Sequence, residues 1–215
     1  MNFKNELKQY QDIINKELEK YIKNEKCPEK VLNDATTYSL MAGGKRLRPV
    51  IAVETALLYG AKQDEIIPTA CAIEMLHCQS LIHDDLPCMD NDDYRRGKLS
   101  NHKVFGESTA TLAGDAFLSF APKIIIDKTP KTVNSDKITA LLNEFFIAAG
   151  VDGIISGQIV DIASEKKEIS KETLEYIYEY KTARLFKLAI RSGAIIAGVN
   201  KNTLEQLTLF AQYYG

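Results

Sequence analysis

Hydrophobic residues recur at steps of three and four along nearly the whole chain, which is the spacing of one face of an α-helix. Over residues 3–21, charged residues fill the positions between them, as on a helix with one buried face. Alternation typical of a strand extends over a few residues at most, and a match at 123–127 is explained equally well by the end of a helix. The pattern therefore predicts an all-α protein whose helices are joined by short loops.

Prolines, glycines and capping residues indicate where these periodic segments begin and end. Pro28 is expected at the first position of a helix, and the Gly43-Gly44 pair just after its end. Ser170 is expected to cap the N-terminus of a long helix. The expected helices span residues 3–21, 28–42, 49–60, 64–85, 108–126, 136–149, 150–163, 171–197 and 203–214.

The composition limits the class of protein further. A chain of 215 residues with 45% hydrophobic content can bury a large core, so we expect one domain over residues 1–215. The net charge is −2, which excludes a typical nucleic-acid binder or polybasic membrane anchor. No apolar run approaches the ~18 residues of a membrane span, and the N-terminal MNFKNELKQY is too polar for a signal peptide. Because the four cysteines form no CxxC pair, we expect a cytoplasmic protein.

Five aspartates gather in one stretch, SLIHDDLPCMDNDDYRRGK (residues 80–98), next to two arginines. The apolar spacing before it puts Asp84 and Asp85 on the last turn of a helix, where the helix dipole opposes each carboxylate by roughly 0.3–1 kcal/mol. Such a cluster suits Mg²⁺, which commonly takes one or two carboxylates together with substrate phosphates. Arg95 and Arg96 can form forked hydrogen bonds to phosphate oxygens. We therefore predict a site where Mg²⁺ holds a diphosphate.

Two other interpretations of this stretch are weaker. A solvated acidic turn followed by a basic one is common on protein surfaces, but the helix before it is too apolar to be a surface helix. A zinc site formed by His83, Cys88 and the aspartates would have a ligand spacing that matches no common pattern.

The sequence GGKRLRP (residues 43–49) is a second candidate site. Two glycines allow a tight turn, and three cations, among them Lys45 and Arg48, follow immediately before or within the first turn of a helix. Backbone amides, the helix dipole and cations together can hold an anion without a metal. A helix that ends in glycine and is followed by exposed charges explains the heptad equally well. The predicted Mg²⁺ site elsewhere favours the first interpretation, because one chain would then offer two diphosphate pockets.

Three further positions place polar side chains in apolar surroundings. His77 lies two turns before Asp84 on the same helix face and could donate to a phosphate, although taken alone it is more typical of a core histidine. Gln158 interrupts an apolar segment, and Lys181 with Thr182 does the same in mid-helix. Each could belong to a solvated face, but Gln158 and Lys181 fall where a cavity would be.

Three motifs in chain order resemble one known family. LIHDDLPCMDNDDYRRGK with its DDx₄D core, GGKRLRP and YKTARLF are similar to motifs of the trans-type (all-E) short-chain prenyl diphosphate synthases, which make farnesyl or geranylgeranyl diphosphate. The resemblance runs from about residue 35 to residue 215, and the DDx₄D…RRG run is the most specific part of it.

The resemblance implies a fold, a reaction and a set of residue roles. The fold would be a bundle of roughly ten helices around a deep central cavity, and the protein a homodimer. The reaction would join isopentenyl diphosphate to an allylic diphosphate (dimethylallyl, geranyl or farnesyl), with Mg²⁺ as cofactor. The implied roles are metal binding for Asp84, Asp85 and Asp90; allylic-substrate binding for Arg95, Lys181 and Thr182; isopentenyl diphosphate binding for Lys45, Arg48, His77 and Arg96; and catalysis for Asp84, Asp85 and Lys181. Gln158 is a further predicted substrate-binding residue, from its place in an apolar run.

This sequence also departs from the family pattern. A second aspartate-rich motif, FQxxDDxxD, is expected soon after a stretch such as FAQYYG, where this sequence ends. We therefore expect a truncated sequence that lacks its C-terminal part; the alternative is a non-catalytic partner subunit of a related synthase. A terpene cyclase is disfavoured by GGKRLRP, because a cyclase has no second diphosphate to hold. Gln79 and Ser80 stand where farnesyl-producing relatives often have an aromatic residue, which favours a product longer than farnesyl.

Overall fold

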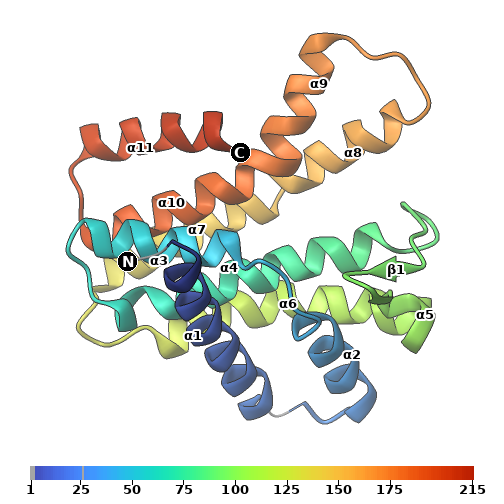
Figure 1. Cartoon of the computed structure of the whole chain (residues 1–215), viewed down its shortest axis with the longest axis horizontal. Helices are drawn as coiled ribbons and strands as arrows, with labels where there is room; N and C mark the ends of the chain where they lie inside the picture. The colour runs from blue at the N-terminus through green and yellow to red at the C-terminus, as the bar shows by residue number, and fades with distance from the viewer. Residues whose placement is uncertain (1–2, 26) are drawn as a thin grey trace.

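The structure, a computed structural model, describes residues 3–25 and 27–215 (Figure 1). The first two residues of the N-terminal stretch considered above lie outside the described residues. The predicted all-α class is confirmed. The helices are α1 (Phe3–Asn24), α2 (Lys30–Leu40), α3 (Leu47–Leu58), α4 (Gln63–Asp84), α5 (Asn101–Phe105), α6 (Glu107–Lys128), α7 (Ser135–Ala149), α8 (Ile154–Ser164), α9 (Lys171–Ile177), η1 (Tyr178–Ala183), α10 (Arg184–Ala197) and α11 (Lys201–Tyr214).

Helix α4 is the centre of the molecule. Figure 1 shows it running through the middle, with α3 and α10 on one side and α6 on the other. Its residues from Ile66 to Leu76 are all buried, because a helix without a polar face must be covered on every side. Helix α10 approaches α3 closely, since a Cβ on Gly193 would lie 2.6 Å from the carbonyl oxygen of Ala52. The end of α4 is thereby held in a rigid frame.

Several helix boundaries differ from the predicted ones. Helix α2 begins at Lys30 rather than at Pro28, because Glu29 has an extended backbone and occupies the N-cap position. Helix α3 begins at Leu47, so Pro49 is the third residue of the first turn, where its missing N–H costs nothing. The helix expected from residue 150 begins only at Ile154.

A small hairpin and a short helix were absent from the predicted elements. Strands β1 (Tyr94–Arg95) and β2 (Lys98–Leu99) pair antiparallel, and α5 follows them. The turn residues Arg96 (φ 54°) and Gly97 (φ 78°) both have the positive φ that a two-residue type I′ turn requires. Residues 123–127, which matched a strand pattern by chance, form part of the last turns of α6. The interpretation of this match as the end of a helix is confirmed.

The long helix expected over 171–197 is interrupted. Ser170 does cap it, since its hydroxyl accepts a hydrogen bond from the Thr173 N–H at 3.2 Å. Between α9 and α10, however, the segment η1 winds as a π-helix (Tyr178–Ala183). Such turns are rare and frequently occur at functional sites.

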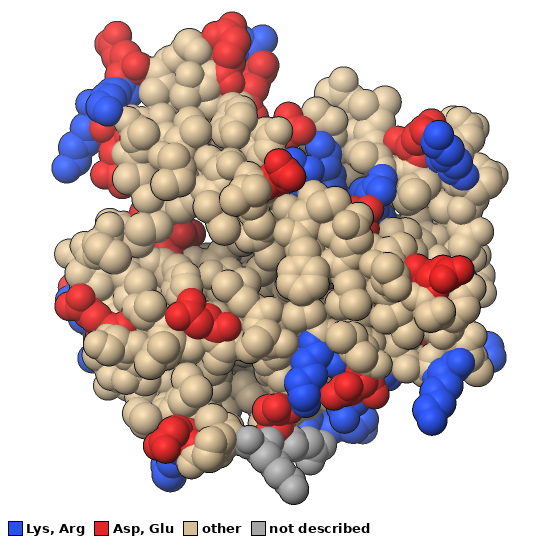
Figure 2. All heavy atoms as spheres, turned by 180° about the vertical axis from the view of Figure 1, so that it is seen from behind, with Lys and Arg blue, Asp and Glu red and all other residues tan. Residues whose placement is uncertain are grey.

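The expected absence of a membrane span stays a prediction. By length and composition, α6 and the segment Ser135–Ser164 could each cross a membrane. A core helix passes the same test, and one side of α6 packs against α4 and α2. On the face opposite to that of Figure 1, charges of both signs are scattered between wide uncharged areas (Figure 2).

Candidate functional site

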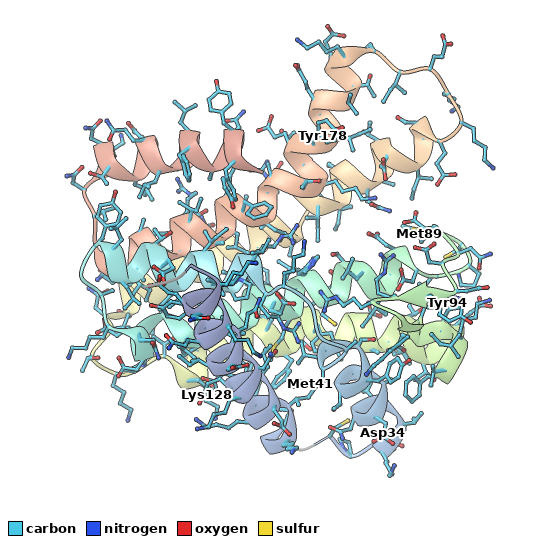
Figure 3. All side chains as sticks on the ribbon, viewed as in Figure 1. Asp34, Met41, Met89, Tyr94, Lys128 and Tyr178 are labelled. Atoms are coloured by element: carbon cyan, nitrogen blue, oxygen red, sulfur yellow. The ribbon has the colours of Figure 1, made fainter. Side chains whose placement is uncertain are left out.

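A cavity of about 450 Å³ lies between α4 and α6 on one side and α8, η1 and the start of α10 on the other. Its walls are mostly aliphatic, with Leu81, Leu118 and Ile159 among the lining residues. Met89, labelled in Figure 3, lines it from the turn that follows α4. The predicted site residues that line this cavity are Arg48, His77, Asp84, Gln158, Lys181 and Thr182, whereas Lys45, Asp85, Asp90, Arg95 and Arg96 lie outside its lining.

Asp84 is the last residue of α4 and is half-buried at the cavity wall. Burial away from water raises the pKa of its carboxyl group to about 6, although Lys181 acts in the opposite direction. The backbone N–H of Asp90 donates to the Asp84 carbonyl oxygen at 2.9 Å, which folds the next turn back over the helix end. The exposed Asp90 side chain lies near enough to add to the raised pKa of Asp84.

Asp85 behaves differently from Asp84, although the two are neighbours in sequence. Its side chain is almost fully buried and accepts a hydrogen bond from Arg95 Nε at 2.9 Å, as well as a second one from Arg95 Nη2. Arg95 Nη2 also donates to Asp92 Oδ2 at 2.8 Å. Asp85 therefore holds Arg95 in the hairpin, and its role as a metal ligand stays a prediction.

The carboxylates are not assembled into a metal cage by themselves. Within residues 3–25 and 27–215, no group of three His, Cys, Asp or Glu side chains is close enough to hold a metal ion. Mg²⁺ does not need such a cage, because it usually keeps several waters and takes one or two carboxylates plus substrate phosphates. Asp84 at the cavity wall and the exposed Asp90 just outside it supply two carboxylates, a donor set that fits Mg²⁺ bound together with a diphosphate.

Lys181 faces Asp84 across the cavity from the π-helical segment η1. Its Nζ donates to Asp161 Oδ2 of α8 at 2.5 Å. Helix α8 can approach this segment only because Gly157 has no side chain: a Cβ there would lie 2.4 Å from the Lys181 backbone nitrogen. Gly157 was not among the predicted site residues, and its only signal was the lack of a side chain in an apolar helix.

Arg48 and His77 form the basic end of the cavity. Burial and the nearby Arg48 guanidinium lower the pKa of His77 to about 3, so its ring is neutral at physiological pH. Arg48 Nη1 lies 3.3 Å from His77 Nε2, and this nitrogen must accept because a guanidinium only donates. The predicted donation from His77 to a phosphate is therefore left to Nδ1. Arg48 Nε is buried without a hydrogen-bond partner among the described residues.

The two basic stretches of the sequence meet at Gly44. Arg96 Nη1 donates to the Gly43 carbonyl oxygen, and a Cβ on Gly44 would lie 2.7 Å from Arg96 Cζ. Beneath them, the buried Glu74 pairs with Arg46 (Nη1–Oε1 2.5 Å) and lies 3.6 Å from Arg96 Nη2. Lys45 is exposed beside this cluster.

Arg46 and Glu74 are therefore structural parts of the site that the predicted roles omitted. Arg46 is buried in a left-handed conformation (φ 49°) and also donates to Asn15 and to the Leu40 carbonyl oxygen. An acidic residue in the middle of an otherwise apolar helix was the signal that could have identified Glu74, because a buried carboxylate requires a partner.

Comparisons with known proteins agree with this geometry. The family model described as polyprenyl synthetase matches residues 29–215. The chain is 46% identical over 184 residues to the farnesyl diphosphate synthase of Bacillus subtilis (strain 168), covering 86% of this chain and 62% of that protein. It is 45% identical to the chloroplastic geranylgeranyl pyrophosphate synthase of Catharanthus roseus, covering 86% of this chain and 52% of that protein.

A solved structure is similar over nearly the whole chain. The FPP/GFPP synthase from Zymomonas mobilis superposes with a TM-score of 0.91 at 34% sequence identity, covering 97% of this chain and 76% of that one. Since this chain spans 62% and 52% of the two relatives above, it corresponds to part of their length.

The Glu74 cluster yields a first prediction. Glu74→Gln leaves Arg46 and Arg96 without their buried counter-ion, and we expect the free energy of unfolding to fall by about 3–5 kcal/mol. Asp34→Asn breaks an exposed ion pair with Lys30 and is the control, with an expected loss below about 1 kcal/mol. Urea denaturation measures both. Equal losses for the two variants would show that Glu74 is not the central counter-ion.

Proposed function

This chain belongs to the polyprenyl synthetase family, and we propose that it acts in a Mg²⁺-dependent prenyltransferase that condenses isopentenyl diphosphate with an allylic diphosphate. The allylic substrate is dimethylallyl, geranyl or farnesyl diphosphate, and the product is farnesyl or geranylgeranyl diphosphate. One observation carries the proposal: a single apolar cavity has Asp84 and Lys181 near one end and Arg48 with His77 near the other, from three distant segments of the chain.

The allylic diphosphate binds at the end of α4. Asp84 and Asp90, with Asp85 as the third predicted ligand, would hold Mg²⁺, and the bound metal would supply positive charge to the diphosphate as it departs. Lys181 adds a second positive charge from across the cavity, and Arg95 a third from the hairpin. Lys181 is already ordered by Asp161, so it pays little conformational entropy when a phosphate replaces that partner. Thr182 and Gln158 contact the same substrate further in.

Isopentenyl diphosphate binds at the basic end without a metal. Arg48 offers a buried Nε without a partner, Arg96 lies against Gly44, and Lys45 is exposed at the rim. The neutral His77 donates from Nδ1. Charge-assisted hydrogen bonds of this kind are the strong ones and suit a diphosphate.

The reaction needs no nucleophile from the protein. Departure of the diphosphate leaves an allylic cation, the double bond of isopentenyl diphosphate attacks it, and loss of a proton restores a double bond. The aliphatic walls of the cavity exclude water that would otherwise capture the cation. No observation favours the alternative of a non-catalytic partner subunit.

Assembly and location are part of the same proposal. We take the protein to be a cytoplasmic homodimer without a membrane span. Three large apolar side chains are each more than half exposed: Leu112 and Ile126 of α6 and Phe146 of α7. Their exposure supports a partner subunit that covers them. Two copies that cover these side chains would also account for the apolarity of α6 and α7.

A second prediction concerns the metal site. In the full-length protein, Asp84→Ala lowers kcat by about 10²–10³-fold, because an interaction that stabilises the departing charge is lost. The circular dichroism spectrum stays as in the wild type and the melting temperature does not fall, because the removed carboxylate is disfavoured by burial. Asp34→Ala, an exposed carboxylate on α2, is the control for removal of a negative charge. Near-normal turnover of the Asp84 variant would refute the metal role.

A third prediction separates the two diphosphate pockets. Arg48→Ala removes a charged donor worth about 1.5–3 kcal/mol, so we expect the KM for isopentenyl diphosphate to rise about 10–100-fold and that for the allylic substrate to change little. Lys45→Ala has the same direction with a smaller effect, since Lys45 is exposed. Lys128→Ala, on a distant surface, is the control. Equal increases for both substrates would contradict the scheme of two pockets.

A fourth prediction concerns product length. Gln79 and Ser80 line the cavity one turn before Asp84, and neither has the bulk of an aromatic side chain. We therefore expect the full-length enzyme to extend its product beyond farnesyl diphosphate. Chromatography of the dephosphorylated products measures this, and farnesyl diphosphate as the sole product would defeat the expectation.

A further inference from the structure

We propose that His83 is a positioning residue: it ties the last turn of α4 to α6 and thereby fixes the direction of the Asp84 side chain. The proposal deepens the proposed function, because the site that His83 supports is the diphosphate site described above. The argument begins with the contacts of the imidazole ring.

Both ring nitrogens of His83 have a partner. Nε2 lies 3.0 Å from the Thr111 carbonyl oxygen of α6, and Nδ1 lies 3.0 Å from Gln79 Nε2 one turn earlier in α4. A carbonyl oxygen can only accept, so Nε2 carries the hydrogen. Nδ1 then has a free lone pair and accepts from the Gln79 amide. With the Gln79 amide oriented as in the structure, the two contacts together assign one tautomer, with the hydrogen on Nε2, and one ring orientation.

Gly114 of α6 provides the space for the ring. A Cβ at this position would lie 2.1 Å from His83 Nε2, and the nearest ring carbon would be 2.4 Å away. Glycine in a helix interior is about 1 kcal/mol less favourable than alanine, so a direct packing reason is needed for it here. The imidazole supplies that reason, because it occupies the space that a side chain would fill. Asp115 Oδ1 is 3.7 Å from Nε2, beyond hydrogen-bond distance.

The end of α4 needs such a tether. Asp84 opposes the helix dipole there and is repelled by Asp85 and Asp90, which raises the free energy of a well-formed last turn. The Asp90 loop is attached to the same turn through the Asp84 carbonyl oxygen. If the turn unwinds, both carboxylates that face the diphosphate move together. His83, the residue next to Asp84, adds a hydrogen bond from this turn to the Thr111 carbonyl oxygen of α6.

Gln79 completes the arrangement from the cavity floor. Its amide nitrogen fixes the ring, while its Oε1 is buried without a partner among the described residues. Gln79 Oε1 receives no hydrogen bond from His83, because the Nε2–H tautomer carries no hydrogen on Nδ1. Groups that bond directly to a metal ligand typically change metal affinity by about 10–100-fold when removed, and His83 acts on Asp84 through the adjacent backbone instead.

The experiment uses the full-length protein and three variants. His83→Leu removes both contacts at similar volume, whereas His83→Gln keeps a side-chain N–H that reaches as far as Nε2. Thr111→Ala changes the exposed side chain but leaves the carbonyl acceptor, and serves as the control. Should His83→Leu fail to fold, His83→Asn, which is polar but too short to reach Thr111, takes its place.

Two readouts need no turnover. Side-chain ¹H–¹⁵N correlation in the metal-free protein assigns the tautomer of His83, one of three histidines. Hydrogen exchange at the Asp85 and Leu86 amides, which bond back into the last turn, reports how firmly that turn is held. We expect the Nε2–H tautomer in the wild type, and exchange at least about 10-fold faster in His83→Leu but near the wild-type rate in His83→Gln and Thr111→Ala. The Nδ1–H tautomer, or unchanged exchange in His83→Leu, would overturn the proposal.

Calorimetry with Mg²⁺ and inorganic diphosphate gives the functional consequence. We expect His83→Leu to bind Mg²⁺–diphosphate about 10–100-fold more weakly, and His83→Gln to recover most of the loss. If His83→Leu loosens the turn yet binds as the wild type does, the positioning role is refuted. If the wild type itself shows no Mg²⁺-dependent binding while the tether behaves as expected, the proposed function fails and the tether of α4 stands.

Discussion

The crowding of carboxylates at the C-terminal end of α4 is the constraint on which the rest of the site depends. The helix dipole and mutual repulsion both disfavour these groups, and partial burial of Asp84 adds a desolvation cost. The protein compensates some of this charge internally: Asp85 is paired with Arg95, and Asp161 with Lys181. Among residues 3–25 and 27–215, the Asp84 carboxylate has no such direct partner, and burial raises its pKa to about 6. Under the proposed function, a divalent cation bound with a diphosphate would compensate its charge.

Next to the other end of the cavity, positive charges are crowded together instead of carboxylates. Arg46, Arg48 and Arg96 converge on one place, and Glu74 is the buried anion that makes their proximity tolerable. His77 contributes no charge, because burial and the neighbouring guanidinium keep it neutral. The three arginines thus share one counter-ion, so the cluster retains positive charge for a second anion. Under the proposed function, this positive charge would hold isopentenyl diphosphate without a metal.

Much of this could be predicted from the sequence, for physical reasons. Helical periodicity is a local signal, so the all-α class and most helices followed from it, and polar residues that interrupt apolar runs, such as Lys181 and Gln158, do line the cavity. The missed features depend on tertiary contacts. The hairpin has strands of two residues, the π-helical turn of η1 leaves the apolar pattern unchanged, and the close approach of α8 at Gly157 requires knowledge of its neighbour. The pairing of Asp85 with Arg95 likewise depends on a turn ten residues away.

The most direct test of the account is a crystal structure of the full-length protein with Mg²⁺ and inorganic diphosphate. The account predicts metal density on Asp84 and Asp90, with the diphosphate bridging toward Lys181, which then leaves Asp161. Electron density for the diphosphate at another place, with Asp84 and Asp90 bare and the Lys181–Asp161 pair intact, would contradict it.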